Sequence, residues 1–310
     1  MIGVASWVLT ALVVLGVAVR LGGWDRGRVL VQGMAFYPYA LGAAAVLAVM
    51  VWLVRQPRPA AVLTVAVVVG VLPLVPRLVA GDGAGAATGG GAAVRVGTLN
   101  LLYGRADPVE VRGIATGVDV LALQELTPEA LDALEDVGLG DVLPHRAVDL
   151  RDGPGGTGVW SRYPLDAREA VPSRYATVHV AVDHPLAADP VEVVAVHVVP
   201  PSGGDVGAWQ EELARLTALD RVDVLLGDFN ATLDHVAFRR LVGAGYVDVG
   251  DAAGRGPTPT WPAEGFRLPG IAIDHVLVDG GWRPAGMQVV DVPGTDHRAL
   301  IADVVPPGQA

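Results

Sequence analysis

Acidic, amide and imidazole side chains recur where apolar, strand-like runs begin or end, and one histidine lies inside such a run. In chain order they are Asn100, Gln124-Glu125, His197, Asp228, Asn230, Asp274-His275 and Asp296-His297. Carboxylates and amides are costly to remove from water unless they are paired or bind a metal. Strand ends are also where a sheet can converge several groups on one point. We therefore expect these side chains to meet at a single site.

The chemistry that suits this set is hydrolysis of a phosphoester. A hard cation such as Mg²⁺, or Mn²⁺, prefers oxygen ligands from one or two carboxylates, water and the substrate phosphate. Such an ion acts as a Lewis acid on the phosphoryl oxygens, and a histidine can take the proton of the attacking water. The chain has no cysteine, no GxSxG motif and no Walker loop, which argues against thiol chemistry, serine hydrolysis by that motif and Walker-type nucleotide binding.

Six short stretches occur together in an order that makes chance an unconvincing explanation. They are Thr98-Leu99-Asn100, Leu123-Gln124-Glu125, residues 157–164 (TGVWSRYP), Val196-His197, Gly227-Asp228-Phe229-Asn230, and Ile273-Asp274-His275 with Thr295-Asp296-His297. In this the chain resembles the endonuclease/exonuclease/phosphatase superfamily, which includes DNase I, apurinic endonucleases, inositol-polyphosphate 5-phosphatases and neutral sphingomyelinases. The resemblance covers about residues 94–305. It implies an α/β fold, the four-layer α/β/β/α sandwich of DNase I, and the strand-rich pattern of this region agrees.

The resemblance also implies three metal-side residues. Glu125 would be the principal Mg²⁺ ligand, Asn100 would lie close to it, and Asp296 would be a further carboxylate on the metal side. Each has a structural alternative. Asn100 could cap a turn, Glu125 could be a solvated strand end, and Asp296 could belong to a surface turn.

Five further residues take catalytic roles by the same resemblance. Asp228 and Asn230 would hold the phosphate and the water, and Asp228 would assist the metal or the base. His297 would be the general base, oriented by Asp274. His197 would contact the phosphate and help to neutralise the leaving group. The alternatives are an Asx-turn at Asp228 and Asn230, a strand-edge charge at Asp274, a surface turn at His297 and a core histidine at His197.

The remaining histidines, including His235 and His275, match no catalytic position and are interpreted as structural or surface residues, with His275 also a candidate for the edge of the site.

The N-terminal part of the chain has a different composition from the rest. The whole chain is 52% hydrophobic with a mean hydropathy of +0.45, and uncharged runs cover residues 2–19, 29–54 and 59–76. A membrane-spanning helix needs roughly 17–25 mostly apolar residues. We therefore expect a membrane anchor of three transmembrane helices over residues 1–80, a flexible Gly/Ala-rich linker over 81–93 and a catalytic domain over 94–306.

The charge distribution bears on the substrate. Residues 1–90 carry six arginines and two aspartates, so with a net charge of −11 for the chain the remainder carries about −15. Binding of DNA depends largely on neutralising its phosphates, so nucleic acid is an unfavoured partner. We expect a phosphoester substrate, with a lipid-linked one as the leading hypothesis, since three helices followed by this domain resemble bacterial membrane phosphatases that act on undecaprenyl pyrophosphate. A membrane-tethered nuclease and a non-enzymatic scaffold are the alternatives, and no protein partner is predicted.

The side of the membrane depends on few charges. The loop after the first run holds Arg20, Arg26 and Arg28, and the next loop holds Arg55 and Arg58. By the positive-inside rule we take the first loop as cytoplasmic and, on that count and on the resemblance, place the catalytic domain on the extracytoplasmic side of the cell membrane. Arg77, after the third run, argues weakly against this.

Overall fold

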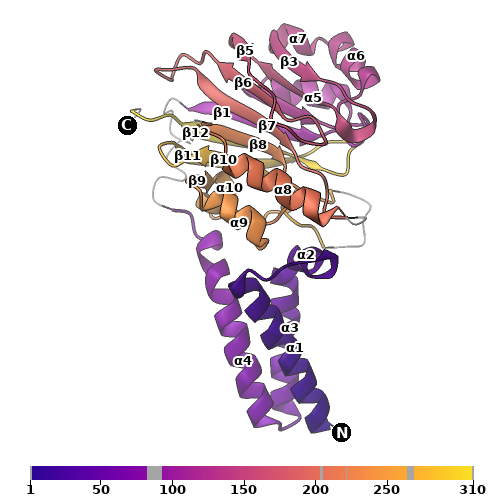
Figure 1. The fold of residues 1–310 in the computed structure, drawn as a ribbon, viewed down its shortest axis with the longest axis vertical. Helices are drawn as coiled ribbons and strands as arrows, with labels where there is room; N and C mark the ends of the chain where they lie inside the picture. The colour runs from indigo at the N-terminus through magenta and orange to yellow at the C-terminus, as the bar shows by residue number, and fades with distance from the viewer. Residues whose placement is uncertain (1, 82–92, 203–204, 221, 264–268, 309–310) are drawn as a thin grey trace.

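The computed structural model describes residues 2–81, 93–202, 205–220, 222–263 and 269–308. Twelve strands within these residues form two six-stranded sheets, which are stacked on each other in the upper part of Figure 1. The first has the order β11 (Arg283–Asp291), β12 (Arg298–Val305), β1 (Val94–Asn100), β2 (Val120–Gln124), β4 (Thr157–Ser161) and β3 (His145–Asp149). The second has the order β5 (Leu165–Ala167), β6 (Val178–Val182), β7 (Val191–His197), β8 (Val224–Asp228), β10 (Asp274–Asp279) and β9 (Tyr246–Asp248). Both sheets are mixed, because β1 runs parallel to β2 and β7 runs parallel to β8.

Helices cover the outer face of each sheet. The first sheet is covered by α5 (Pro108–Ala115), α6 (Pro128–Asp136) and α7 (Leu139–Val142). The second is covered by α8 (Val206–Thr217) and α9 (Val236–Val242), while α10 (Val249–Ala252) follows β9. A short 3-10 helix, η3 (Gly153–Gly155), precedes β4. Helices lie outside two stacked sheets, so the predicted α/β/β/α arrangement agrees with the structure.

Alternation along the strands decides which residues lie between the sheets. In β7, Val193 and Ala195 belong to the core between the sheets, whereas Val194 and Val196 pack outward against the helices. Successive side chains of a strand point to opposite faces. His197, the last residue of β7, therefore lies on the inter-sheet face, at one end of the sandwich.

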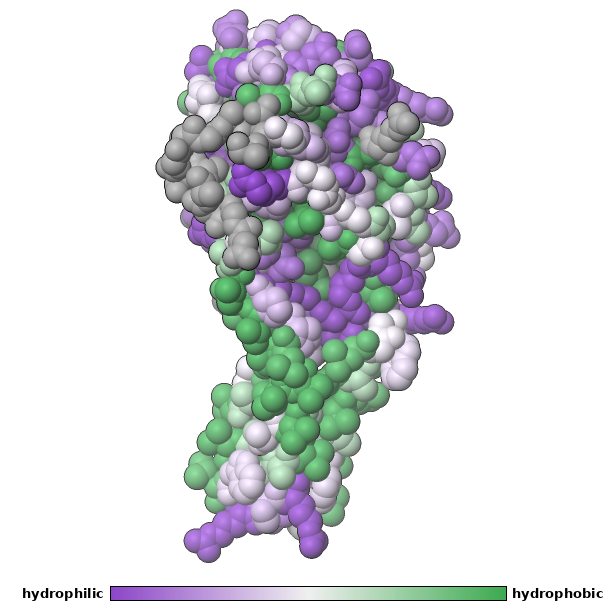
Figure 2. All heavy atoms as spheres, turned by 90° about the vertical axis from the view of Figure 1, so that its left-hand side faces the viewer, coloured by the Kyte–Doolittle hydropathy of each residue, from purple (hydrophilic) through white to green (hydrophobic). Residues whose placement is uncertain are grey.

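The predicted anchor, residues 2–78, consists of three long apolar helices and one short one. They are α1 (Ile2–Gly22), α2 (Arg28–Met34), α3 (Tyr37–Leu53) and α4 (Pro57–Val71), which continues as the 3-10 helix η1 (Leu72–Leu78). Helix α4 contacts both α1 and α3, and the three form the bundle below the catalytic domain in Figure 1. Figure 2 shows that the bundle surface is mostly hydrophobic, apart from its far end. Among the described residues two helices, 2–22 and 57–78, are long and apolar enough to cross a membrane.

The second apolar run differs from the expected single helix. It is broken into α2 and α3, which meet at 77°, so that it counts as a third span only if this bent pair is taken as one. Pro38 stands in the first turn of α3, a position that proline favours because its missing N–H has no partner there. Val31 of α2 is fully buried against the core of the catalytic domain, which holds the short helix on that domain. The linker lies almost entirely outside the described residues.

The anchor is docked on the catalytic domain through buried charges. Arg20 at the end of α1 and Arg77 in η1 both contact Oδ1 of Asp234, with distances of 2.7 and 3.1 Å. Each arginine also donates to the carbonyl of Leu233. Nearby, Asp25 accepts from the N–H of Val236. Breaking a buried pair of this kind costs much more than an exposed one, so these contacts fix the anchor relative to the domain.

This docking corrects the expected link between the first loop and the side of the membrane. The loop after α1 contacts the catalytic domain and therefore lies on the same side of the bundle, as an odd number of spans requires. A cytoplasmic first loop would place the domain in the cytoplasm as well. Arg20 and Arg77 are paired with Asp234, which leaves two exposed arginines at each end of the bundle: Arg26 and Arg28 near the domain, Arg55 and Arg58 at the far end. The charges of the loops therefore do not decide the orientation.

Candidate functional site

Strand pairing places several of the predicted site residues side by side. In the second sheet His197 pairs with Asp228, and Asp228 pairs with Asp274, so the ends of β7, β8 and β10 form one row. In the first sheet Asn100 pairs with Gln124. Both rows lie at the same end of the sandwich and on the faces that the sheets turn toward each other, which brings their side chains together.

The two rows are joined by the side chain of Asn100. Its Nδ2 donates to Oδ2 of Asp228 at 3.1 Å and to Oε1 of Glu125 at 3.2 Å. Its Oδ1 accepts from the N–H of Leu102 at 3.0 Å. Glu125 and Asp228 therefore lie within the reach of one amide, although they belong to different sheets.

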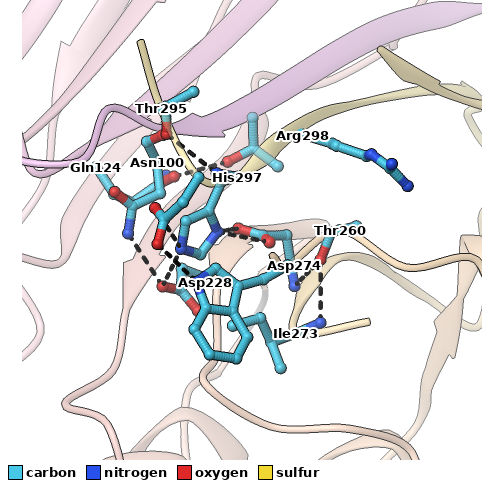
Figure 3. A network of polar contacts seen from close by, with 12 residues as sticks. Asn100, Gln124, Asp228, Thr260, Ile273, Asp274, Thr295, His297 and Arg298 are labelled. Carbon is cyan, nitrogen blue, oxygen red and sulfur yellow. Dashed lines mark hydrogen bonds and ion pairs between the residues drawn. The ribbon is translucent and has the colours of Figure 1, made fainter. Parts of the chain in front are cut away.

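His297 lies between two carboxylates, as Figure 3 shows. Nδ1 is 2.9 Å from Oδ2 of Asp274, and Nε2 is 4.0 Å from Oδ2 of Asp228. Thr295 fixes the loop, because its hydroxyl accepts from the N–H of His297 and donates to the carbonyl of Asn100. The hydrogen bond to Asp274 sets the ring so that Nε2 faces Asp228 and the cavity.

The carboxylates around the His297 ring change its pKa. Burial disfavours the charged ring, but the neighbouring Asp274, Asp228 and Asp296 outweigh this and raise the pKa of His297 to about 9. Burial and the adjacent Asp274 raise the pKa of Asp228. Without a cation in the site, His297 therefore holds a proton at neutral pH.

His197 is held in the opposite state. It is buried, and burial together with the charge of His297 lowers its pKa to about 3. The ring of Tyr175 packs on it with a centroid distance of 4.6 Å, and Nδ1 of His197 has no hydrogen-bond partner among the described residues. A neutral ring with an unused nitrogen at a cavity wall can bond to a bound anion.

Left-handed backbone conformations occur at two of these residues. Glu125 has φ = 54° and Asn230 has φ = 48°. Asparagine tolerates this region, whereas a glutamate rarely adopts it, and such conformations tend to collect at functional sites. Asn230 bonds to Oδ1 of Asp228 through its N–H and to Val198 O and Asp228 Oδ2 through its amide. Both of these turns direct polar side chains to the end of the sandwich.

The donor set at one side of the cavity fits a divalent cation. Oδ2 of Asp296 accepts from Nε1 of Trp261 at 2.8 Å, while its Oδ1 is buried without a hydrogen-bond partner among the described residues. Within the part of the chain that the structure describes, the donors to Glu125 are neutral: the amide of Asn100 and the N–H of Tyr103. Burial, and to a smaller extent the charge of Asp296, raises the pKa of Glu125. Two carboxylates in one cavity, one with an unused oxygen, suit an ion that takes oxygen ligands.

A second group of possible ligands lies deeper. Asp228, Asp274 and His297 each offer an atom within 4.8 Å of the others. However, Asp274 and His297 already bond to each other, and Asp228 accepts from Asn100 and Asn230. This group therefore suits proton transfer and phosphate contact better than it suits metal binding.

The cavity in front of these residues has a volume of about 490 Å³. That size is typical of sites for small molecules. Of the eight predicted residues, six line it: Glu125, His197, Asp228, Asn230, Asp296 and His297. Asn100 and Asp274 lie behind them and contact Asp228 and His297.

Three residues of the anchor also line this cavity, and the sequence analysis did not predict them as site residues. Gln32 lies on α2, and Ala35 and Phe36 form the turn between α2 and α3. Gln32 donates to the carbonyl of Pro201 at 3.2 Å. The available sequence signal was one polar glutamine within a mostly apolar run. The cavity is thus bounded in part by the short helix that leads into the N-terminal helical bundle.

Two histidines outside the predicted set differ in their roles. Nδ1 of His235 accepts from the N–H of Thr232, so Nε2 carries the proton and donates to the carbonyl of Val31 at 2.8 Å, which holds α2 against the domain. His275 pairs with Asp248 at 2.7 Å on the outer face of the sheet and does not line the cavity, because it is one residue out of phase with Asp274. The expectation that His275 borders the site is wrong.

Comparison with known proteins places this geometry in a family. A family model described as Endonuclease/Exonuclease/phosphatase family matches residues 97–297. A crystal structure of an endonuclease/exonuclease/phosphatase from Beutenbergia cavernae is 23% identical with a TM-score of 0.58, covering 70% of this chain and 72% of that one. An AP endonuclease from Archaeoglobus fulgidus is 17% identical with a TM-score of 0.53, covering 67% and 98%. A humanized TDP2 of D. rerio is 16% identical with a TM-score of 0.54, covering 68% and 98%. A search of curated proteins gave no match.

Proposed function

Because the chain belongs to the endonuclease/exonuclease/phosphatase family, we propose that it is a membrane-anchored, Mg²⁺- or Mn²⁺-dependent phosphoesterase that hydrolyses a lipid-borne phosphate ester or pyrophosphate. Members of this family hydrolyse phosphoesters or nucleic acids. The finer assignment rests on the position of the cavity, which is walled on one side by Gln32, Ala35 and Phe36 of the anchor. A phosphate carried by a membrane lipid is the substrate that such a position favours.

In this proposal Glu125 and Asp296 hold the cation. When bound, it supplies Lewis acidity at the phosphoryl oxygens. Asn100 acts as a positioning residue, because its amide holds Glu125 and Asp228 in place while its Oδ1 is already engaged by Leu102. The indole of Trp261 orients Asp296. Partners of this kind commonly affect metal affinity as strongly as some of the ligands do.

The proton chemistry is assigned to His297. Asp274 holds Nδ1, so Nε2 is the atom that takes the proton of the attacking water. The raised pKa of His297 keeps the ring protonated at neutral pH, and a cation held by Glu125 and Asp296 would lower that pKa by its positive charge. The ring would then be neutral, as a general base requires. His197, Asp228 and Asn230 also line the cavity and would contact the phosphate and the leaving oxygen.

The end of the bundle next to the catalytic domain supports a lipid substrate. Trp24, in the loop after α1, and Val29, in the first turn of α2, are 59% and 82% exposed. Exposed tryptophan and aliphatic side chains at such a place are typical of a helix that lies in the headgroup region. The acidic catalytic domain, by contrast, offers poor electrostatics for a polynucleotide.

The test is a screen for released phosphate or nucleotide with the full-length protein in detergent. The substrates are a polyprenyl pyrophosphate, a phospholipid, a nucleoside triphosphate and an oligonucleotide, each with and without Mg²⁺ or Mn²⁺. We expect metal-dependent turnover of a lipid substrate that is lost in Asp228→Ala. Turnover of the oligonucleotide alone would identify a tethered nuclease instead, and the absence of turnover on every substrate would refute the assignment as a phosphoesterase.

A further inference from the structure

A second cavity of about 310 Å³ lies directly beside the catalytic one, where the anchor meets the catalytic domain. The two cavities share Ala35 and Ile271 in their walls. The polar groups of the catalytic cavity are absent from the second one. Its charged wall residues are Arg77 and Asp234, which are bound to each other.

The remaining wall of this second cavity is mostly apolar and is shared between the anchor and the catalytic domain. Pro38 and Tyr39 belong to α3, and Leu74 and Leu78 belong to η1, the continuation of the membrane-spanning helix α4. The domain side is formed around Ile271 and Gly270, and the hydroxyl of Tyr39 donates to the carbonyl of Gly270 at 2.6 Å. The cavity therefore connects the end of a spanning helix to the wall of the catalytic site.

From this continuity, and resting on the proposed function, we propose that the second cavity binds the part of the substrate's hydrocarbon chain next to the phosphate. The phosphate would lie against Glu125 and His297 while the chain passes Ala35 and Ile271 toward Leu74 and Leu78. An apolar chain gains free energy by leaving water for such a wall. The site would therefore select lipid phosphates over water-soluble ones by chain contact rather than by headgroup contact.

Two exposed leucines of the same short helix provide a matched pair of variants. Leu78 lines the second cavity and is 63% exposed, whereas Leu72 is 62% exposed and does not line it. Leu78→Trp should narrow the cavity, and Leu72→Trp should only change the surface that faces lipid. Leu74→Trp is a second variant that fills the same cavity from a more buried position.

The binding test uses a polyprenyl phosphate with a diazirine close to its phosphate, cross-linked to the full-length protein in detergent. We expect labelling of peptides around 74–78 or 256–257 and 270–272 that is competed by unlabelled polyprenyl pyrophosphate. The label should be lost in Leu78→Trp and Leu74→Trp and kept in Leu72→Trp. Labelling confined to the outer surface of the bundle in all variants, or competed equally by a phospholipid, would overturn the proposal.

A kinetic test separates this inference from the proposed function. With a polyprenyl pyrophosphate, Leu78→Trp should lower kcat/KM by about tenfold, the loss that corresponds to roughly two buried methylene groups. With inorganic pyrophosphate, which has no hydrocarbon chain, the same variant should differ from the wild type by less than about twofold, a change well below the energy of one buried methylene group. Equal losses on both substrates would overturn the chain site. If the wild type hydrolyses neither, pyrophosphate is ruled out as the headgroup, and the cross-linking result decides the chain site by itself.

Discussion

Nδ2 of Asn100 and Oδ2 of Asp228 lie 3.1 Å apart, across the gap between two sheets and 128 positions apart in the chain. The same Nδ2 contacts Glu125, so one amide joins the residues proposed to hold the cation to those proposed to hold the phosphate. The two parts of the proposed chemistry are therefore linked through a contact between the sheets.

Removal of the base should abolish turnover without unfolding the protein. His297→Asn should lower kcat by about 10²- to 10⁴-fold, the range expected for loss of a positioned proton acceptor. His145→Asn, a change of the same type on β3 outside the cavity, should leave kcat unchanged. Rates are measured as metal-dependent phosphate release on the best substrate of the screen. Equal kcat values for the two variants would remove His297 from the reaction.

The stability of the metal-free protein should depend on pH through His297. Its folded pKa of about 9 lies above the ordinary value of 6.5, so its interactions with the carboxylates stabilise the fold fully below about pH 6.5. That contribution is lost as the pH rises through about 9. In the presence of a chelator, the difference in free energy of unfolding between wild type and His297→Asn should therefore shrink from pH 6 to pH 10. A difference that grew over this range would contradict the assigned protonation state.

The indole of Trp261 should matter for metal binding through Asp296. Trp261→Phe removes the hydrogen bond to Oδ2 of Asp296, and we expect Mn²⁺ affinity to fall by about 10- to 100-fold. Trp282→Phe is the matched control, because its indole bonds to Asp223 at 3.0 Å, far from the cavity. Titration calorimetry with Mn²⁺ measures both. Similar affinities for the two variants would show that Asp296 is not on the metal side.

Docking of the anchor should depend on Asp234. Asp234→Asn leaves two buried arginines without their carboxylate and should lower the free energy of unfolding in mild detergent by about 3–5 kcal/mol. The exposed Asp189→Asn provides the control and should have little effect. If both variants unfold like the wild type, the buried pairs do not hold the anchor on the domain.

The side of the membrane can be tested directly because the chain contains no cysteine. Asp189→Cys places one thiol on the catalytic domain, and Arg58→Cys places one at the far end of the bundle. With a membrane-impermeant maleimide on intact cells, the predicted extracytoplasmic domain requires labelling of the first variant and protection of the second. The reverse pattern would place the catalytic domain in the cytoplasm.

The sequence alone was enough to predict the α/β fold class and to name the candidate site residues, because strand-like runs and short motifs are local patterns. Short β-rich runs that end at Asn100 and Asp228 or begin at Asp274 can be recognised one strand at a time, and the uncharged runs predict an anchor without reference to the rest of the chain. Tertiary structure decided the rest. Which strand ends pair, and that the amide of Asn100 spans both sheets, follow from packing between segments far apart in the chain.

The same holds for the anchor. Composition could not show that the run over 29–54 bends by 77°, because the bend is stabilised by Val31 and His235 in a contact between residues 204 positions apart. Nor could the charge count show that Arg20 and Arg77 form buried ion pairs with Asp234 and are not exposed at the end of the bundle. Local sequence specifies apolar character and polar strand ends. Only the folded chain specifies which buried groups neutralise each other, because that depends on distances that arise after packing.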